Sequence, residues 1–227
     1  MKMIENTRED DIFLLLDADE LPTKEALIFL KLFDGWREPV KFGFRWTVFG
    51  FFWLKAEDPG QLESIPLIGK LFSRKKQERL LTLYTVCTLG MLSTVYGDNA
   101  MLLRRNVWNN TLLHDRLNNY TANHPKIQEW TLGNIGHYAG HHCSWCYSPE
   151  GIRLKLEAAQ RHDKPRWGDY PDKLNLKYIQ ELIRTGGWFD GSKPFISVPR
   201  TKNDTGLFAP DYILNSNLFQ YLVKPPS

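Results

Sequence analysis

The sequence has few cysteines, no long apolar run and almost no excess of charge of either sign. It holds three cysteines in 227 residues, and a chain of this length can bury enough apolar surface to fold without disulfides. No stretch of 18 apolar residues occurs, so the sequence as given predicts no transmembrane helix, and its first residues lack the apolar core of a signal peptide. The net charge of +3 is too small to favour a nucleic-acid partner.

Apolar and aromatic residues are abundant, at 42% and 13% of the chain, with eight tryptophans. This composition is typical of a globular protein rather than a disordered one. Apolar periodicity predicts strands at 12–16, 40–48 and 101–105. Together with capping residues, it predicts helices at 23–33, 148–160 and 172–186 and near the C-terminus. The mixed order predicts an α/β fold, a mixed sheet with flanking helices. We expect one domain over 1–227, with an insertion or loop at 61–84.

The apolar run 12–16 ends in two aspartates one residue apart, Asp17 and Asp19, followed by Glu20. Carboxylates at the carboxyl end of a buried strand lie where open α/β sheets bind ligands. In an extended segment, side chains two residues apart point the same way, so Asp17 and Asp19 can converge on one ion. Such oxygen ligands suit Mg²⁺ or Mn²⁺, with phosphate completing the shell. The alternative is a strand that runs into an acidic turn.

The segment 137–146 holds three histidines and a C-x-x-C pair, Cys143 and Cys146. Zinc would need a second ligand pair at a defined spacing, and the remaining Cys87 has no such partner. We favour a buried aromatic-rich turn with a disulfide, either within the pair or to Cys87. A further possibility is that one of the histidines completes a metal shell begun by Asp19.

A third group of polar residues, Arg166, Trp167 and Asp169, falls in the predicted loop 165–170. Loops that combine a cation, an aromatic ring and an acid are common at binding sites. The segment could equally be a capping turn for the helix that follows, with Asp172 as its N-cap.

Three classes of function compete on these motifs. A phosphatase of the haloacid dehalogenase type also begins with an apolar strand and a D-x-D, but it needs threonine or valine where Leu21 stands. A nucleotide-sugar transferase uses the D-x-D only to hold a divalent metal against a diphosphate. A non-catalytic carbohydrate-binding fragment would explain the tryptophans and leave the acids without a role.

Six motifs together resemble glycosyltransferase family 17. They are Asp-Ala-Asp-Glu-Leu-Pro (17–22), Phe-Leu-Lys-Leu-Phe-Asp-Gly-Trp (29–36), the aromatic run 49–53, the histidine and cysteine segment 137–146, Pro-Arg-Trp-Gly-Asp-Tyr (165–170), and Leu-Ile-Arg-Thr-Gly-Gly-Trp-Phe-Asp-Gly (182–191). The resemblance implies transfer of N-acetylglucosamine from UDP-N-acetylglucosamine to the 4-hydroxyl of the core β-mannose of a glycoprotein N-glycan. It also implies inversion at the sugar and a divalent cation, Mn²⁺ or Mg²⁺.

The resemblance also suggests roles for individual residues. Asp19 would ligate the metal, Asp17 would orient the ribose or a metal-bound water, and His142, which matches a family histidine, is a third candidate ligand. For the acceptor, an inverting transfer needs one carboxylate as general base, and Asp169 is preferred to Glu150. Arg166 and Trp167, beside Asp169, would hold a phosphate and a sugar ring.

The family further implies a glycosyltransferase-A-like fold, of which an N-terminal nucleotide-binding half is missing from this chain. We expect a Golgi-lumen protein whose only membrane contact would be an N-terminal anchor absent here. Three N-glycosylation sequons, at Asn109, Asn119 and Asn203, favour a lumenal location. Without the missing half, the strand 12–16 would lie at a sheet edge, where exposed apolar strands promote aggregation.

Overall fold

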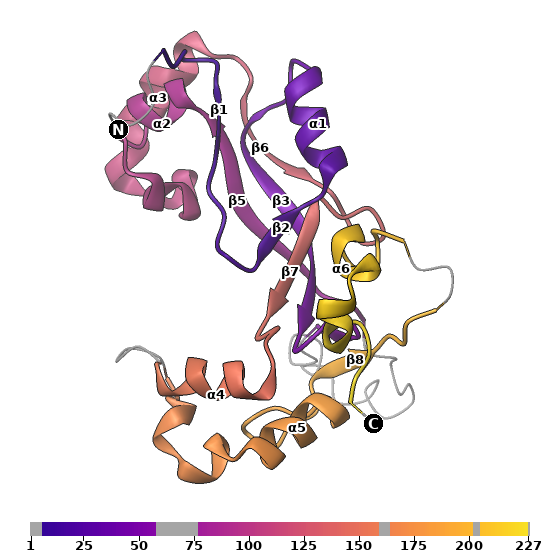
Figure 1. Cartoon of the computed structure of the whole chain (residues 1–227). Coiled ribbons are helices and arrows are strands. Elements are labelled where there is room, and N and C mark those ends of the chain that lie inside the picture. Colours follow the sequence, from indigo (N-terminus) through magenta and orange to yellow (C-terminus); the bar gives the residue numbers. More distant parts are fainter. Residues whose placement is uncertain (1–5, 58–76, 159–163, 202–204, 227) are drawn as a thin grey trace, which may run out of the picture. The chain divides into compact units, whose positions relative to one another are not determined.

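The structure is a computed structural model that describes residues 6–57, 77–158, 164–201 and 205–226. The chain forms two compact units. Unit 1 comprises Met1–Arg45 and Leu80–His141, and unit 2 comprises Trp46–Arg79 and His142–Ser227. Strands and helices alternate in mixed order around a largely antiparallel sheet (Figure 1), which confirms the predicted α/β class. The glycosyltransferase-A-like fold and the missing half stay predictions.

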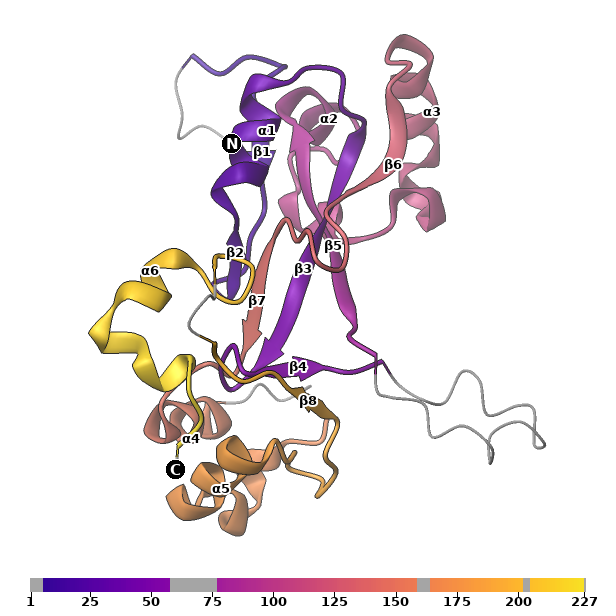
Figure 2. The ribbon, with the colours of Figure 1, turned by 90° about the vertical axis from the view of Figure 1, so that its right-hand side faces the viewer.

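The sheet of unit 1 is built on β5 (Leu80–Thr88), which pairs antiparallel with both β1 (Ile12–Leu14) and β3 (Glu38–Val48). The other edge of β3 pairs in parallel with β6 (Ile127–Leu132). β2 (Glu20–Pro22) pairs with β7 (Gly140–Ser144), which in turn pairs with β3. Figure 2 shows β5, β3 and β7 running along one another.

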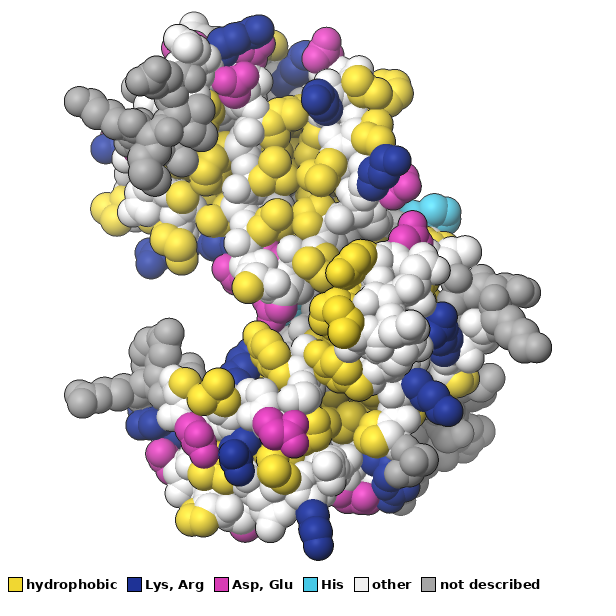
Figure 3. All heavy atoms as spheres, viewed as in Figure 1, with side chains coloured by type: hydrophobic (Ala, Val, Ile, Leu, Met, Phe, Trp, Pro, Cys, Tyr) yellow, Lys and Arg dark blue, Asp and Glu magenta, His cyan; other side chains and the backbone are white. Residues whose placement is uncertain are grey.

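Among the described strands, β1 lies at the end of the sheet order and pairs only with β5, so it is an edge strand as expected. Nearby apolar side chains are exposed, including Leu32 at 69% and Phe33 at 58% in α1 and just after it. Figure 3 shows hydrophobic side chains gathered over the face that carries β1 and α1. An edge of this kind favours association with other chains.

Helix α1 (Lys24–Leu32) begins as the sequence predicts, because the Thr23 side chain accepts a hydrogen bond from the backbone N–H of Ala26 at 3.2 Å. It covers one face of β3. The predicted strand at 40–48 is confirmed, but the sequence pattern indicates one buried face, whereas side chains on both faces of β3 are shielded, including Arg45 at 4% exposure. The core under α1 contains the following residues: Ala26, Leu30, Val40, Phe42, Phe44, Val86 and Ala139.

A second core of unit 1 lies under α2 (Leu89–Thr94) and α3 (His114–Asn123) and three 3₁₀ helices, η2 (Ala100–Arg104), η3 (Val107–Asn109) and η4 (Thr111–Leu113). The strand predicted at 101–105 is therefore wrong. The Asn99 side chain accepts from the backbone N–H of Met101 and starts a 3₁₀ turn there, a local alternative to strand pairing.

Unit 2 contains the end of β3, β4 (Trp53–Lys55) and β8 (Phe195–Ser197), joined in that order by antiparallel pairing. Around an aromatic core lie α4 (Pro149–Glu157), η5 (Trp167–Asp169), η6 (Pro171–Leu174), α5 (Leu176–Thr185), α6 (Asp211–Asn215) and η7 (Asn217–Leu222).

The predicted ends of the helices in unit 2 are confirmed for the N-terminus of α4 and the C-terminus of α5, but not for the N-terminus of α5. Ser148 caps α4 with Pro149 in its first turn, and Gly186 ends α5 in the left-handed region at a φ of 66°, as predicted. The predicted cap Asp172 is wrong: it lies in η6, and the side chain of Asn175 caps α5 instead.

The expected loop or insertion at 61–84 needs a correction at its end. Residues 61–76 lie outside the described residues, but 80–84 belong to β5, a central strand of unit 1. The apolar alternation of that stretch was obscured by the charged run that precedes it. In the described part of the chain, no helix is both long and apolar enough to cross a membrane.

Candidate functional site

Asp17 and Asp19 lie in a tight turn of unit 1 between β1 and β2. The backbone N–H of Glu20 donates to the carbonyl oxygen of Asp17 at 3.0 Å, which closes the turn. β1 ends at Leu14, two residues earlier than predicted, and the acids lie in a turn rather than in the extended segment on which their expected convergence depends; the stated alternative, a strand that runs into an acidic turn, describes this backbone. Asp17 is exposed and Asp19 partly exposed, so the turn presents these acids at the surface.

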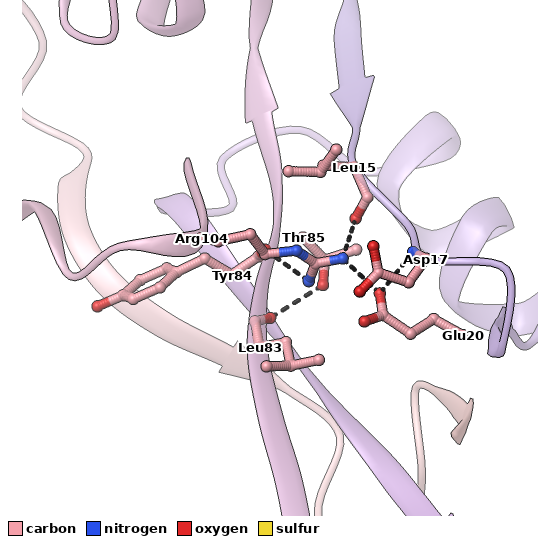
Figure 4. Close-up of polar contacts among 7 residues, drawn as sticks. All are labelled: Leu15, Asp17, Glu20, Leu83, Tyr84, Thr85 and Arg104. Carbon is pink, nitrogen blue, oxygen red and sulfur yellow. Dashed lines mark hydrogen bonds and ion pairs between the residues drawn. The ribbon is translucent and has the colours of Figure 1, made fainter. Parts of the chain in front are cut away.

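Glu20, the third acid of the motif, is buried and forms an ion pair with Arg104. The residue is 3% exposed, and its Oε2 lies 2.5 Å from Nη2 of Arg104. The same guanidinium donates to the carbonyl oxygens of Leu15 at 3.0 Å and Tyr84 at 3.1 Å. Oε2 of Glu20 also accepts from the backbone N–H of Asp17 at 3.2 Å. Figure 4 shows how these bonds converge from β5, η2 and the turn.

This arrangement fixes the position of the acidic turn. The five donors of an arginine lie in a rigid planar fork, so one side chain can hold several acceptors at once. Arg104 therefore ties the end of β1, the turn and β5 together. This role of Arg104 was not predictable from the sequence, because Arg104 lies 84 residues after its acidic partner and inside a segment that resembled a strand.

A close backbone approach supports the turn from its other side. A Cβ added to Gly140 of β7 would lie 2.6 Å from the carbonyl oxygen of Leu21 and 2.7 Å from the ring of Phe44. Only glycine allows β7 to run this close to β2. Gly140, which precedes the histidine pair, therefore allows β7 to pack against β2, the strand that follows the acidic turn.

The donors for a metal are only partly assembled. Among the described residues, no group of three histidine, cysteine, aspartate or glutamate side chains could hold a metal ion. Asp17 and Asp19 belong to unit 1, and His142 belongs to unit 2, so the three-residue ligand set stays a prediction. Two surface carboxylates suit Mg²⁺ or Mn²⁺ where water and phosphate oxygens supply the other ligands.

His142 lies at the start of unit 2 in a short hydrogen-bonded chain. Its Nε2 is 2.8 Å from Oγ of Ser144, and that oxygen accepts from the indole N–H of Trp46 at 3.1 Å. The rings of His142 and Trp46 also meet edge to face, 6.1 Å apart. One nitrogen of the imidazole is thus engaged within unit 2.

Cys143 and Cys146 form a disulfide with each other, which confirms the favoured interpretation of this segment. Their sulfurs are therefore not thiolate ligands, and the zinc alternative loses its two cysteines. Cys87 is buried in unit 1 as a free thiol. Burial, with a smaller contribution from the Glu38 carboxylate, raises the pKa of this thiol well above its usual value.

The loop 165–170 packs against the core of unit 2. Trp167 stacks on Phe189 with ring centroids 6.1 Å apart, and a Cβ on Gly168 would lie 2.1 Å from the carbonyl oxygen of Leu156 in α4. Arg166 and Asp169 form an ion pair with each other at 3.5 Å. The carboxylate of Asp169 remains 59% exposed, so the predicted general base is open to solvent.

Glu150 is a first-turn acid of α4, as its position after Ser148 suggests. Hydrogen bonds from its own backbone N–H and from Ser148 hold the pKa of this exposed carboxyl below its usual value. An acid in the first turn also interacts favourably with the helix dipole, and the assignment of Glu150 as a candidate base stays a prediction.

Unit 2 also contains a cavity that the motifs did not reveal, with a volume of about 550 Å³. Three cationic side chains and three aromatic rings contribute to its lining. The only signal in the sequence is the spacing of polar residues along α5. The lining residues are Phe49, Tyr147, Pro149, Lys177, Gln180, Glu181, Ile183, Arg184, Tyr221, Lys224 and Pro226.

Comparison with known proteins finds glycosyltransferases that are similar to this chain in sequence. It is 42% identical over 224 residues, 98% of its length, to the β-1,4-mannosyl-glycoprotein 4-β-N-acetylglucosaminyltransferase of Rattus norvegicus. The proteins of the same name from Mus musculus and Homo sapiens match at the same identity and coverage. The chain spans 37% of the length of each relative. No family profile and no solved structure matches it.

Proposed function

We propose that this chain, a homologue of the mannosyl-glycoprotein N-acetylglucosaminyltransferases, forms part of an enzyme of that activity. The reaction would move N-acetylglucosamine from UDP-N-acetylglucosamine to the 4-hydroxyl of the core β-mannose of an N-glycan. The observation that carries the proposal is 42% identity over 98% of the chain. Neither a phosphatase nor a non-catalytic carbohydrate-binding fragment gains support from the relatives.

The acidic turn would serve the donor. A bound Mn²⁺ or Mg²⁺ would offset the charge that develops on the diphosphate leaving group. In this proposal Asp19 ligates the cation, with His142 as a candidate further ligand, and Asp17 orients the ribose or a metal-bound water. The ion pair of Glu20 with Arg104 supports this assignment, because a fixed turn holds its acids in place before the donor arrives.

The acceptor would be activated from unit 2. Inversion at the sugar needs a single carboxylate to take the proton of the attacking hydroxyl. Asp169 is the proposed base, since its carboxylate is largely exposed beside Arg166. Arg166 and Trp167 are proposed to contact phosphate and sugar, although both also help to pack the loop.

A lumenal location, in the Golgi, is part of the proposal. The sequon residues Asn109 and Asn119 are both exposed in unit 1, so a glycan could be attached without unfolding. Asn203 lies outside the described residues. Expression in a secreting cell followed by enzymatic removal of N-glycans would show a loss of mass at these sites if they are used.

The transferase proposal is tested in a chimera in which this chain replaces the matching segment of the rat relative. With UDP-N-acetylglucosamine, Mn²⁺ and an N-glycan acceptor, the chimera should form the β-1,4-linked product. Asp19→Ala and Asp19→Asn should each lower kcat by a factor of about 10² or more. Alanine removes the metal ligand, and the amide of asparagine keeps the shape of the side chain but loses its charge.

Controls separate binding from catalysis. Asp169→Asn should keep the affinity for the donor and lose transfer, whereas Glu150→Gln should keep most of both. Normal transfer by either Asp19 variant at ordinary Mn²⁺ concentration would refute the metal assignment. Covalent phosphorylation of Asp17 by a phosphate donor would instead support the phosphatase.

A further inference from the structure

The walls of the cavity of unit 2 are formed by three segments that are distant in the sequence, and Phe49 from a fourth segment lies at its base. α5 provides one wall, the residues just before and within the first turn of α4 provide another, and the end of η7 with the residues that follow it provides the third. Figure 1 and Figure 2 both show the C-terminus near these helices. The apolar base includes Phe49 and Ile183, which are 1% and 5% exposed.

The base of the cavity is held firmly by the aromatic core. Phe49 contacts the rings of Trp188, Phe189 and Phe195, with centroids between 5.9 and 6.4 Å apart. Ile183 lies on the buried face of α5, and its carbonyl oxygen accepts from the indole N–H of Trp53 at 2.7 Å. The cavity is therefore a feature of the packed unit rather than a gap between loops.

The charge of the lining is positive. Lys177, Arg184 and Lys224 contribute three cations, and Glu181 contributes one anion. Glu181 is occupied by Arg184, which donates two hydrogen bonds to it at 2.9 and 2.7 Å. Across the described residues, Lys177 and Lys224 form no ion pair with an acid. Two ammonium groups thus remain available to an anion.

Two tyrosines complete the lining. Tyr147 and Tyr221 are each 44% exposed, so part of each ring is accessible to a ligand. Burial raises the pKa of the Tyr221 hydroxyl above its usual value, and a tyrosine hydroxyl is protonated and can donate at neutral pH in any case. Aromatic rings present a flat apolar face with a polar tip, a combination that suits a sugar ring with its C–H face and its hydroxyls.

We propose that this cavity binds an anionic saccharide, that is, a sugar ring that carries a carboxylate or phosphate group. The acid group would be held by Lys177 and Lys224, and the ring would lie against Tyr147 and Tyr221. Small-molecule sites typically measure about 300–1,000 Å³ and combine an apolar wall with a few polar groups. A volume of about 550 Å³ accommodates one or two sugar units.

Two sources could supply this chemistry, and both are compatible with the proposed transferase. A carboxylate sugar would come from an acidic glycan, and a sugar phosphate would come from a nucleotide sugar. The proposal does not rest on the chemistry of the acidic turn, because every lining residue belongs to unit 2. Asp19→Asn should therefore leave binding in this cavity unchanged.

Isothermal titration of the chain with four probes tests the proposal. They are 3′-sialyllactose, neutral lactose, N-acetylglucosamine 1-phosphate and UDP-N-acetylglucosamine, all with a chelator present to remove divalent metal. At least one anionic probe should bind, and lactose should bind at least about tenfold more weakly, because tenfold corresponds to the 1.4 kcal/mol of a modest charge-assisted contact. The anionic probe whose binding the cavity variants weaken identifies the source as carboxylate or phosphate.

Variants locate the binding. The double variant Lys177→Met with Lys224→Met should lower the affinity for the anionic probe about tenfold or more, and salt should weaken wild-type binding. Lys164→Met, an exposed lysine of the same unit that does not line the cavity, is the matched control. Tyr221→Leu should also weaken binding, while thermal unfolding verifies that each variant is folded.

Three results would overturn the proposal. The first is that neither anionic saccharide nor nucleotide sugar binds. The second is that lactose binds as tightly as 3′-sialyllactose. The third is that the double lysine variant and Lys164→Met have the same effect. Loss of transfer in the Asp19 variants with intact binding here would show that the two sites are separate.

Discussion

Replacement of Arg104 by methionine should be the most destabilising single change in the acidic turn. The substitution keeps the length and apolar stem of the side chain and removes its donors. It leaves the Glu20 carboxylate, 1% exposed at its side chain, without its cation. It also removes donors from two backbone carbonyls, those of Leu15 and Tyr84.

The size of the effect follows from this burial. Removal of one partner from a buried ion pair costs about 3–5 kcal/mol, because the remaining charge is desolvated without compensation. For a chain of this length, the expected loss of melting temperature is about 6–20 °C, at 2–4 °C for each kcal/mol. Glu20→Gln should cost less, about 1–3 kcal/mol, because the amide oxygen still accepts a hydrogen bond.

Thermal and urea unfolding, followed by circular dichroism, would measure these differences. The control is Arg184→Met, which breaks a surface pair with Glu181 in which both side chains are at least half exposed, and should change stability by only about 0–1 kcal/mol. Combining Arg104→Met with Glu20→Leu should recover part of the loss. If Arg104→Met matched the Arg184 control, or if Glu20→Gln were the more damaging change, the ion pair would not hold the turn.

Two further predictions concern acid stability and thiol chemistry. Hydrogen bonds from Lys41 and, to a smaller extent, Tyr84 hold the pKa of Glu129 below its usual 4.5. The ionised Glu129 therefore stabilises the folded protein fully above the unfolded-state pKa, and this contribution is lost as pH falls through the lower pKa of the folded state. Glu129→Gln should flatten the decline in melting temperature below about pH 4.5, and an unchanged decline would contradict this. Cys87 should resist a thiol reagent in the native protein; one thiol should react after denaturation, and three after reduction of the 143–146 disulfide as well. Rapid native labelling would show that Cys87 is accessible.

The sequence predicted those features that neighbouring residues determine. The predicted helix caps Thr23, Ser148 and Gly186 are confirmed. A cap depends only on the residues of the helix turn beside it, which are close in the sequence. The prediction that Asp172 caps α5 was wrong because Asn175, three residues later, can cap a helix equally well. In the fold Asp172 lies within the 3₁₀ helix η6, so α5 begins after Asn175. Competition between two nearby polar side chains is not visible in a single sequence.

Contacts between distant residues were beyond prediction. The partner of β1 is β5, which lies more than sixty residues later, across a charged segment. The cation of Glu20 comes from η2, whose residues show the apolar content of a strand. Hydrophobic periodicity identifies the face that a segment buries, but it carries no information on which segment covers that face.

Two of the three motifs that suggested chemistry contain residues that are committed to structural contacts in the fold. In the acidic motif, Glu20 is committed to Arg104, and Asp17 remains exposed with Asp19 beside it. In the histidine and cysteine segment, the two sulfurs bind each other. The acidic turn is therefore where a ligand would find surface carboxylates on a fixed backbone, and a test of donor binding there addresses the proposed reaction most directly.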